Sequence, residues 1–150
     1  MNRKVYVDTT RPPYVEEISV GEHRLLADEP QGAGGTDAGP DPYELLLAAL
    51  GSCTCITVRM YAARKRWPLE AVHVALTHAK VHSEDCAGCD TAARSMDQIE
   101  MQITLTGALS ADQRERLLEI AGKCPVHRTL TSTVRINTRV VQRLESGAEA

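Results

Sequence analysis

Apolar residues recur at helical spacing between Asp41 and Trp67, and this segment carries the strongest structural signal in the chain. Asp41 is a favourable N-cap, Pro42 suits the first helical position, and Glu44 stands where a capping box needs its acidic residue. The pattern stops at Trp67 and Pro68, which predicts a helix of about 25 residues. Since its surface is apolar almost all round as far as Val58, we expect it to be central and covered on several sides.

Alternating apolar and polar residues predict strands on both sides of this helix. Residues 5–27 are predicted to form short strands, with a break at residues 11–13 and a turn at Gly21. Further strands are expected around residues 72–77, 99–106 and 134–140. The stretch from Pro30 to Pro40 is rich in glycine and proline and predicts a loop. It is not followed by the Lys and Ser or Thr of a phosphate-binding loop, which argues against that function.

Two shorter helices are predicted after these central strands. Ser110 and Gln113 can form a second capping box, Gly122 suits the end of that helix, and Pro125 can begin a third. This order of elements indicates an α+β fold with mostly antiparallel sheets and a single domain over residues 1–145. We expect a disordered tail at 146–150. One long apolar helix on a small sheet leaves surface uncovered, which favours a symmetric dimer.

Composition restricts the class of protein. Among the 150 residues only 3% are aromatic and none is Phe, so the core must be aliphatic. A net charge of -3 argues against a nucleic-acid partner. We expect no membrane segment and no signal peptide, and therefore a cytoplasmic protein. Its five cysteines should then be mostly reduced, which favours redox, catalytic or metal-binding roles over structural disulfides.

Cys124 stands directly before Pro125, with Lys123 and Arg128 close by. Because proline favours the first position of a helix, Cys124 is expected at the N-cap, where free N–H groups and the positive end of the helix dipole favour a thiolate. A thiolate is the reactive form of cysteine. The alternative is that Cys124 simply packs as a small apolar residue. Taken alone, the residues leave both interpretations open.

The remaining cysteines allow further arrangements. Cys53 and Cys55 point about 200° apart on a helix and cannot bridge each other; Cys53 shares a stripe with Leu46, Leu50, Thr57 and Met60. Cys86 and Cys89 form a CxxC downstream of His78 and His82, which allows a zinc site or a regulatory dithiol. On an extended strand the two histidines would lie about 13 Å apart, too far for both to bind one ion. One histidine with the two cysteines and a fourth ligand would still form a zinc site, and this alternative stays open. Our prediction for the chain as a whole is no bound metal and no other cofactor.

Two segments together resemble a known family. GPDPYELLLAALGSCTCITVRMYA, from Gly39 to Ala62, and CPVHRTL, from Cys124 to Leu130, are similar to the OsmC/Ohr family of organic hydroperoxide reductases. The resemblance extends from about residue 23 to 140. It implies an intertwined homodimer in which sheets wrap long central helices. It also implies that Cys53 is the peroxidatic cysteine and that Cys124 resolves it.

The resemblance implies a reaction and further site residues. Cys53 would reduce an alkyl or lipid hydroperoxide to the alcohol and form a disulfide with Cys124, which a dithiol reductant of lipoyl or thioredoxin type would reopen. In the family an acidic residue orients an arginine over the thiolate. Glu44 and Arg11 are the candidates here, with Arg24 as the rival arginine. The alternative is an OsmC-like protein that senses redox state or metal, or binds a ligand, without peroxidase turnover.

Overall fold

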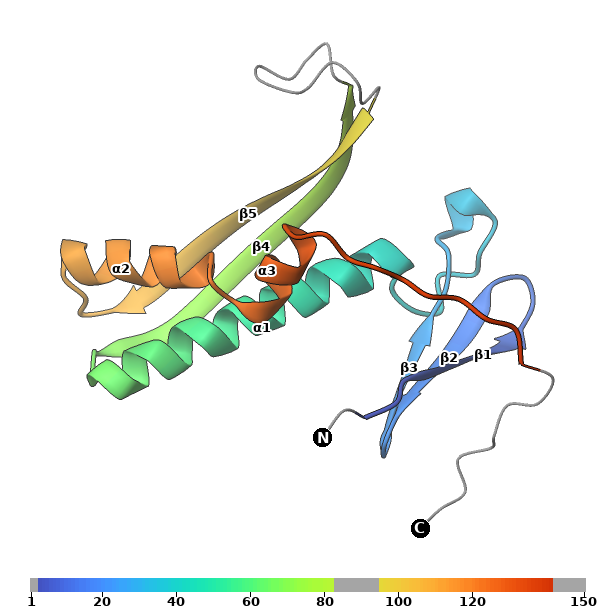
Figure 1. Ribbon diagram of the computed structural model, residues 1–150, viewed down its shortest axis with the longest axis horizontal. Helices are drawn as coiled ribbons and strands as arrows, with labels where there is room; N and C mark the ends of the chain where they lie inside the picture. Colours follow the sequence, from blue (N-terminus) through green and yellow to red (C-terminus); the bar gives the residue numbers. More distant parts are fainter. Residues whose placement is uncertain (1–2, 83–94, 142–150) are drawn as a thin grey trace.

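The computed structural model describes residues 3–82 and 95–141. Figure 1 shows the elements in chain order, which are β1 (Tyr6–Arg11), β2 (Val15–Val20), β3 (His23–Ala27), a short 3-10 turn (Gln31–Ala33), α1 (Pro42–Lys65), β4 (Leu69–His82), β5 (Ser95–Gly107), α2 (Ala111–Ala121) and α3 (Pro125–Leu130). The expected α+β class is confirmed. The expected tail at 146–150 lies outside the described residues.

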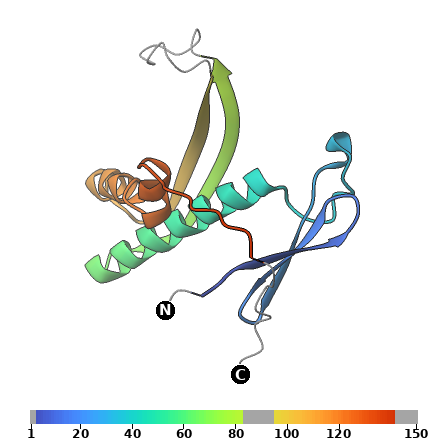
Figure 2. The ribbon, with the colours of Figure 1, turned by 45° about the vertical axis from the view of Figure 1, so that its right-hand side comes forward.

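The strands form two separate antiparallel sheets. β1, β2 and β3 pair in that order, and β4 and β5 form a long two-stranded ribbon. α1 crosses one face of the ribbon, and α2 and α3 pack beside α1 (Figures 1 and 2). The three-stranded sheet lies near the start of α1, away from the ribbon.

The alternation read from the sequence is confirmed in the ribbon. Ile99, Met101 and Ile103 are half-buried, whereas Glu100 and Gln102 between them are exposed. The buried core is aliphatic, as a chain without Phe requires. The core lies between α1, α2 and the loop that precedes α2. It consists of Val58, Ala62, Leu109, Leu117 and Ala121.

α1 begins as expected and approaches β4 closely. The Asp41 carboxylate accepts the Glu44 N–H at 2.8 Å, and the Glu44 carboxylate accepts the Asp41 N–H at 2.9 Å, so the capping box is present. A Cβ atom at Gly51 would lie 2.9 Å from Cδ1 of Leu76. Glycine at this position therefore lets the helix backbone lie against the strand.

The described residues, 3–82 and 95–141, cover one side of α1. The buried residues are Leu50, Gly51, Thr54, Val58 and Ala62. On another side Ile56 is 57% exposed and Met60 68% exposed. By length and composition α1 could cross a membrane, but core helices of soluble proteins pass the same test. Here α1 packs against β4, α2 and α3.

The expected strand over residues 134–140 is wrong for the single chain. This segment is extended, but it pairs with no strand in the described part of the chain. Val134, Ile136 and Val140 are 55%, 83% and 98% exposed. A strand needs a neighbouring edge to satisfy its N–H and C=O groups. Among the described residues no strand pairs with this segment as it runs from α3 towards the three-stranded sheet (Figure 1).

Asp28 organises the loop that leads from β3 into α1. Its buried carboxylate accepts hydrogen bonds from the Thr36 hydroxyl at 2.5 Å and from the N–H groups of Glu29, Thr36 and Ala38. These bonds, first of all the one from the Thr36 hydroxyl, lower the pKa of Asp28 from 3.8 to about 2. The ionised carboxylate therefore holds the loop in place.

Replacing this carboxylate should destabilise the protein in a pH-dependent way. Asp28→Asn puts an amide where several N–H groups need an acceptor, so we expect the melting temperature at pH 7 to fall by about 5 °C. Because the folded pKa is depressed, the stabilisation is complete above pH 3.8 and is lost as pH falls towards about 2. The difference between the two proteins should therefore narrow over that interval in thermal melts followed by circular dichroism.

Asp37→Asn is a matched control, because Asp37 is an exposed carboxylate of the same loop. Asparagine also tolerates the positive φ at this position. An equal loss of stability in both variants would contradict the role assigned to Asp28.

Candidate functional site

Cys124 is the N-cap of α3, as its place before Pro125 predicts. Its sulfur accepts the backbone N–H of His127 at 3.3 Å. The side chain is completely buried. A free N–H group at the start of the helix therefore donates to a sulfur that water does not reach.

The Cys124 sulfur also touches α1. Thr54 Oγ1 lies 3.4 Å from Cys124 Sγ, and either group can donate to the other. Thr54 is itself fully buried, and its hydroxyl lies 3.9 Å from the Met101 sulfur on β5. The start of α3 is thus held against the turn of α1 that carries Cys53, because Thr54 directly follows Cys53 in the chain.

Cys53 and Cys55 lie on different faces of that turn. Both thiols are free and half-buried. The Cys55 sulfur lies 3.9 Å from the carbonyl oxygen of Val72 on β4 and borders a groove between α1 and that strand. Cys55 therefore faces the ribbon. The adjacent Thr54 is the residue that shares a hydrogen bond with Cys124.

Glu44 and Arg11 lie on different elements. The Glu44 carboxylate completes the capping box of α1, whereas Arg11 is exposed at the end of β1. Arg24 donates to the carbonyl oxygens of Gly21 and His23 within the three-stranded sheet. No ion pair joins Glu44 to either arginine within residues 3–82 and 95–141. Among the described residues, these candidates therefore form no salt bridge with one another.

His78 has side-chain partners on α1 and β5. Its ring stacks on Tyr43 with centroids 4.3 Å apart, and Nε2 lies 2.9 Å from Asp97 Oδ1. The first turn of α1 is thereby fastened to β4 and β5. Where the structure describes the chain, no cluster of three metal-ligating side chains occurs. Cys86 and Cys89 lie outside the described residues.

The sequence interpretation did not assign a role to Thr54 or to Tyr43. Thr54 falls on the helical stripe of Leu50 and Val58, both of which are buried, so its spacing could have identified it as an inward hydroxyl. Tyr43 gave no comparable signal, because its partner His78 lies on a distant strand.

One protein family matches the region of the chain that contains α1 and α3. The model of the family described as OsmC-like protein matches residues 34–139, which include both cysteine segments. The chain belongs to the OsmC-like protein family. A comparison with curated proteins found no match.

Solved structures of OsmC-like proteins share the fold. An OsmC-like protein from Mycoplasma pneumoniae is 16% identical, with a TM-score of 0.69 and 87% of each chain covered. The organic hydroperoxide resistance protein OsmC from Legionella pneumophila is 17% identical, with a TM-score of 0.64, covering 87% of this chain and 90% of that one. The organic hydroperoxide resistance protein OhrB of Bacillus subtilis is 15% identical, with a TM-score of 0.60, covering 87% and 91%. At these identities the likeness establishes the OsmC fold.

Proposed function

We propose that this OsmC-like protein is a thiol-dependent peroxidase that reduces alkyl or lipid hydroperoxides to alcohols. The observation that carries the proposal is the contact between Thr54 and Cys124, because it brings the Cys124 sulfur to the turn of α1 that holds Cys53. The matched family region contains both cysteines, and the resemblance to the OsmC/Ohr family assigns the peroxidatic role to Cys53 and the resolving role to Cys124. Two of the similar structures are named organic hydroperoxide resistance proteins.

The first step belongs to Cys53. Its thiolate attacks the terminal oxygen of the hydroperoxide, the O–O bond breaks, and the alkoxide leaves and takes up a proton to become the alcohol. The sulfur is oxidised to a sulfenic acid. Half-burial of Cys53 suits this step, because the thiol is reachable by a substrate yet partly shielded from water.

The second step belongs to Cys124. Its thiolate attacks the Cys53 sulfur, the S–O bond breaks, and the departing hydroxide takes up a proton to become water. The N–H of His127 and the hydroxyl of Thr54 can both donate to a Cys124 thiolate. A dithiol reductant then reopens the Cys53–Cys124 disulfide and restores both thiols.

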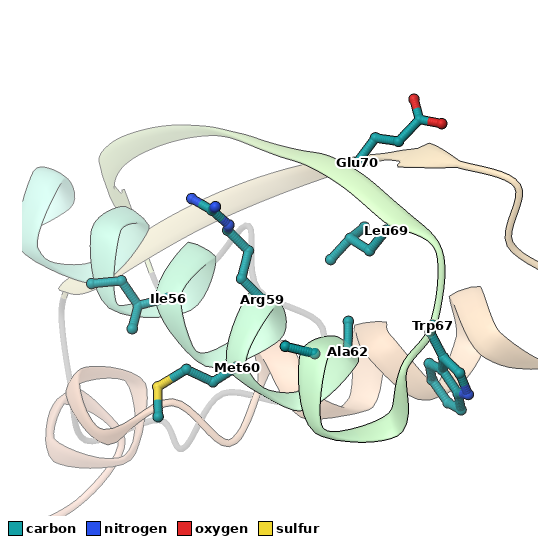
Figure 3. Close-up of a pocket in the computed structure, with 8 residues that line it drawn as sticks. Ile56, Arg59, Met60, Ala62, Trp67, Leu69 and Glu70 are labelled. Carbon is teal, nitrogen blue, oxygen red and sulfur yellow. The ribbon is translucent and has the colours of Figure 1, made fainter.

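A second copy of the chain completes the site in this proposal. Ile56 and Met60 project from α1 beside a hollow at its end and are mostly exposed (Figure 3). The extended segment at residues 133–141 has exposed apolar side chains and no strand partner among the described residues. A homodimer would cover Ile56 and this extended segment. It would also allow the partner's sheet to supply Arg11, or Arg24, to the Cys53 site and to the Glu44 carboxylate.

The dimer predicts a measurable mass. Sedimentation equilibrium should give about twice the 16.4 kDa of one chain. A monomer at micromolar concentration would contradict the shared site.

Turnover is the direct test of the proposed function. The reduced protein should consume cumene hydroperoxide over many cycles when dihydrolipoamide or reduced thioredoxin is supplied, and it should release one alcohol per peroxide. Peroxide is followed by a colorimetric assay and alcohol by chromatography. Consumption no faster than with the dithiol alone would favour a sensing or binding role without peroxidase turnover.

A further inference from the structure

A cavity of about 520 Å³ opens between α1, α2 and α3, next to the Cys124 helix. Its size is in the range of cavities that bind small molecules. One part of its wall is apolar and another carries cations. The apolar part is formed by Met60, Ile120 and Pro125, and the polar part by Tyr61, Arg64 and Lys123.

Among the described residues, the two cations at this cavity have no carboxylate partner. Neither Arg64 nor Lys123 forms an ion pair in the part of the chain that the structure describes. The nearby Arg116 is different, because it pairs with Glu119. Arg64 and Lys123 thus offer positive charge at the edge of an apolar surface, and nothing within these residues neutralises it.

Tyr61 fixes the cationic side of the cavity. The Arg64 guanidinium carbon lies 5.4 Å from the centre of the Tyr61 ring, a cation–π distance that restrains the arginine. Arg116 donates to the Tyr61 hydroxyl oxygen at 3.2 Å. That bond leaves the Tyr61 O–H able to donate to an anion.

We propose that this cavity binds an aliphatic carboxylate, with its hydrocarbon chain on the apolar wall and its carboxylate between Arg64 and Lys123. Charge complementarity argues for this occupant, because a neutral apolar molecule would leave both cations without a counterion. A small inorganic anion would leave the apolar wall exposed to water. The proposal concerns binding alone and does not depend on peroxidase turnover.

The cavity is lined by residues that are close in the sequence to both cysteines. Pro125 directly follows Cys124, and Thr57, which also lines the cavity, lies one helical turn after Cys53. A carboxylate held at Arg64 and Lys123 would therefore direct its chain along α1 in the neighbourhood of both cysteines.

Isothermal titration of the full-length protein with decanoate and with 1-decanol tests the proposal. The two probes have equal chain length and differ in charge. We expect decanoate to bind about tenfold more tightly than 1-decanol. Arg64→Gln and Lys123→Gln should each weaken decanoate about fivefold and leave 1-decanol unchanged. Higher salt should reduce the preference for decanoate.

Arg59→Gln is the matched control, because it removes the same charge from an exposed residue of α1 that does not line this cavity. It should leave decanoate binding unchanged. Circular dichroism melts should show that these exposed substitutions keep the fold. Equal affinity for both probes, equal weakening in all three variants, or no decanoate binding because a second copy fills the cavity would each overturn the proposal.

Discussion

Cys53→Ser is expected to abolish hydroperoxide turnover, with a fall of about a thousandfold or more. Serine keeps the size of the side chain but lacks a sulfur that can accept the peroxide oxygen, so no sulfenic acid can form. Steady-state peroxide consumption with dihydrolipoamide measures the effect.

Cys55→Ser is the matched control for this prediction. Cys55 is two residues away on the same helix and half-buried to a similar degree, but it faces Val72 on the ribbon. Its turnover should stay within about twofold of the unchanged protein. If Cys53→Ser retained full activity, or if both variants lost it equally, Cys53 would not be the residue attacked by peroxide.

Cys124→Ser is expected to stop turnover after one cycle when the reductant acts only on the disulfide. Because serine is a favourable N-cap, the start of α3 should stay formed and the loss can be assigned to chemistry. Without a resolving thiol, the Cys53 sulfenic acid persists and reacts with further peroxide to give sulfinic and sulfonic acids.

Stopped-flow and mass measurements separate these stages. One equivalent of alcohol should appear in a burst, and mass spectrometry should then find two or three added oxygen atoms on the peptide that contains Cys53. Dimedone, which traps sulfenic acids, should label Cys53 before this oxidation is complete. Unchanged steady-state turnover in Cys124→Ser would contradict its assignment as the resolving thiol.

Local patterns in the sequence predicted most elements of this fold. The capping box at Asp41 and Glu44 and the proline after Cys124 each act within a few residues, and both helix starts are as expected. The final strand was predicted wrongly because alternation shows which residues could pair but does not supply an edge. In the single chain, Val134 and Ile136 remain exposed.

The candidate site could be predicted only in part. The place of Cys124 at the N-cap followed from Pro125, but its contact with Thr54 joins residues 70 positions apart and required the folded chain. The same holds for the stacking of Tyr43 on His78. The assignment of Cys53 as the first nucleophile came from the family resemblance, because helix position alone favours Cys124.

The central claim is that Cys53 and Cys124 form one redox pair, and peptide mapping tests it most directly. The reduced protein is treated with one equivalent of cumene hydroperoxide, alkylated and digested without reductant. The account predicts a disulfide-linked pair of peptides that contain Cys53 and Cys124, which disappears after treatment with dihydrolipoamide. A disulfide formed instead by Cys86 and Cys89, with Cys53 and Cys124 both alkylated as free thiols, would contradict it.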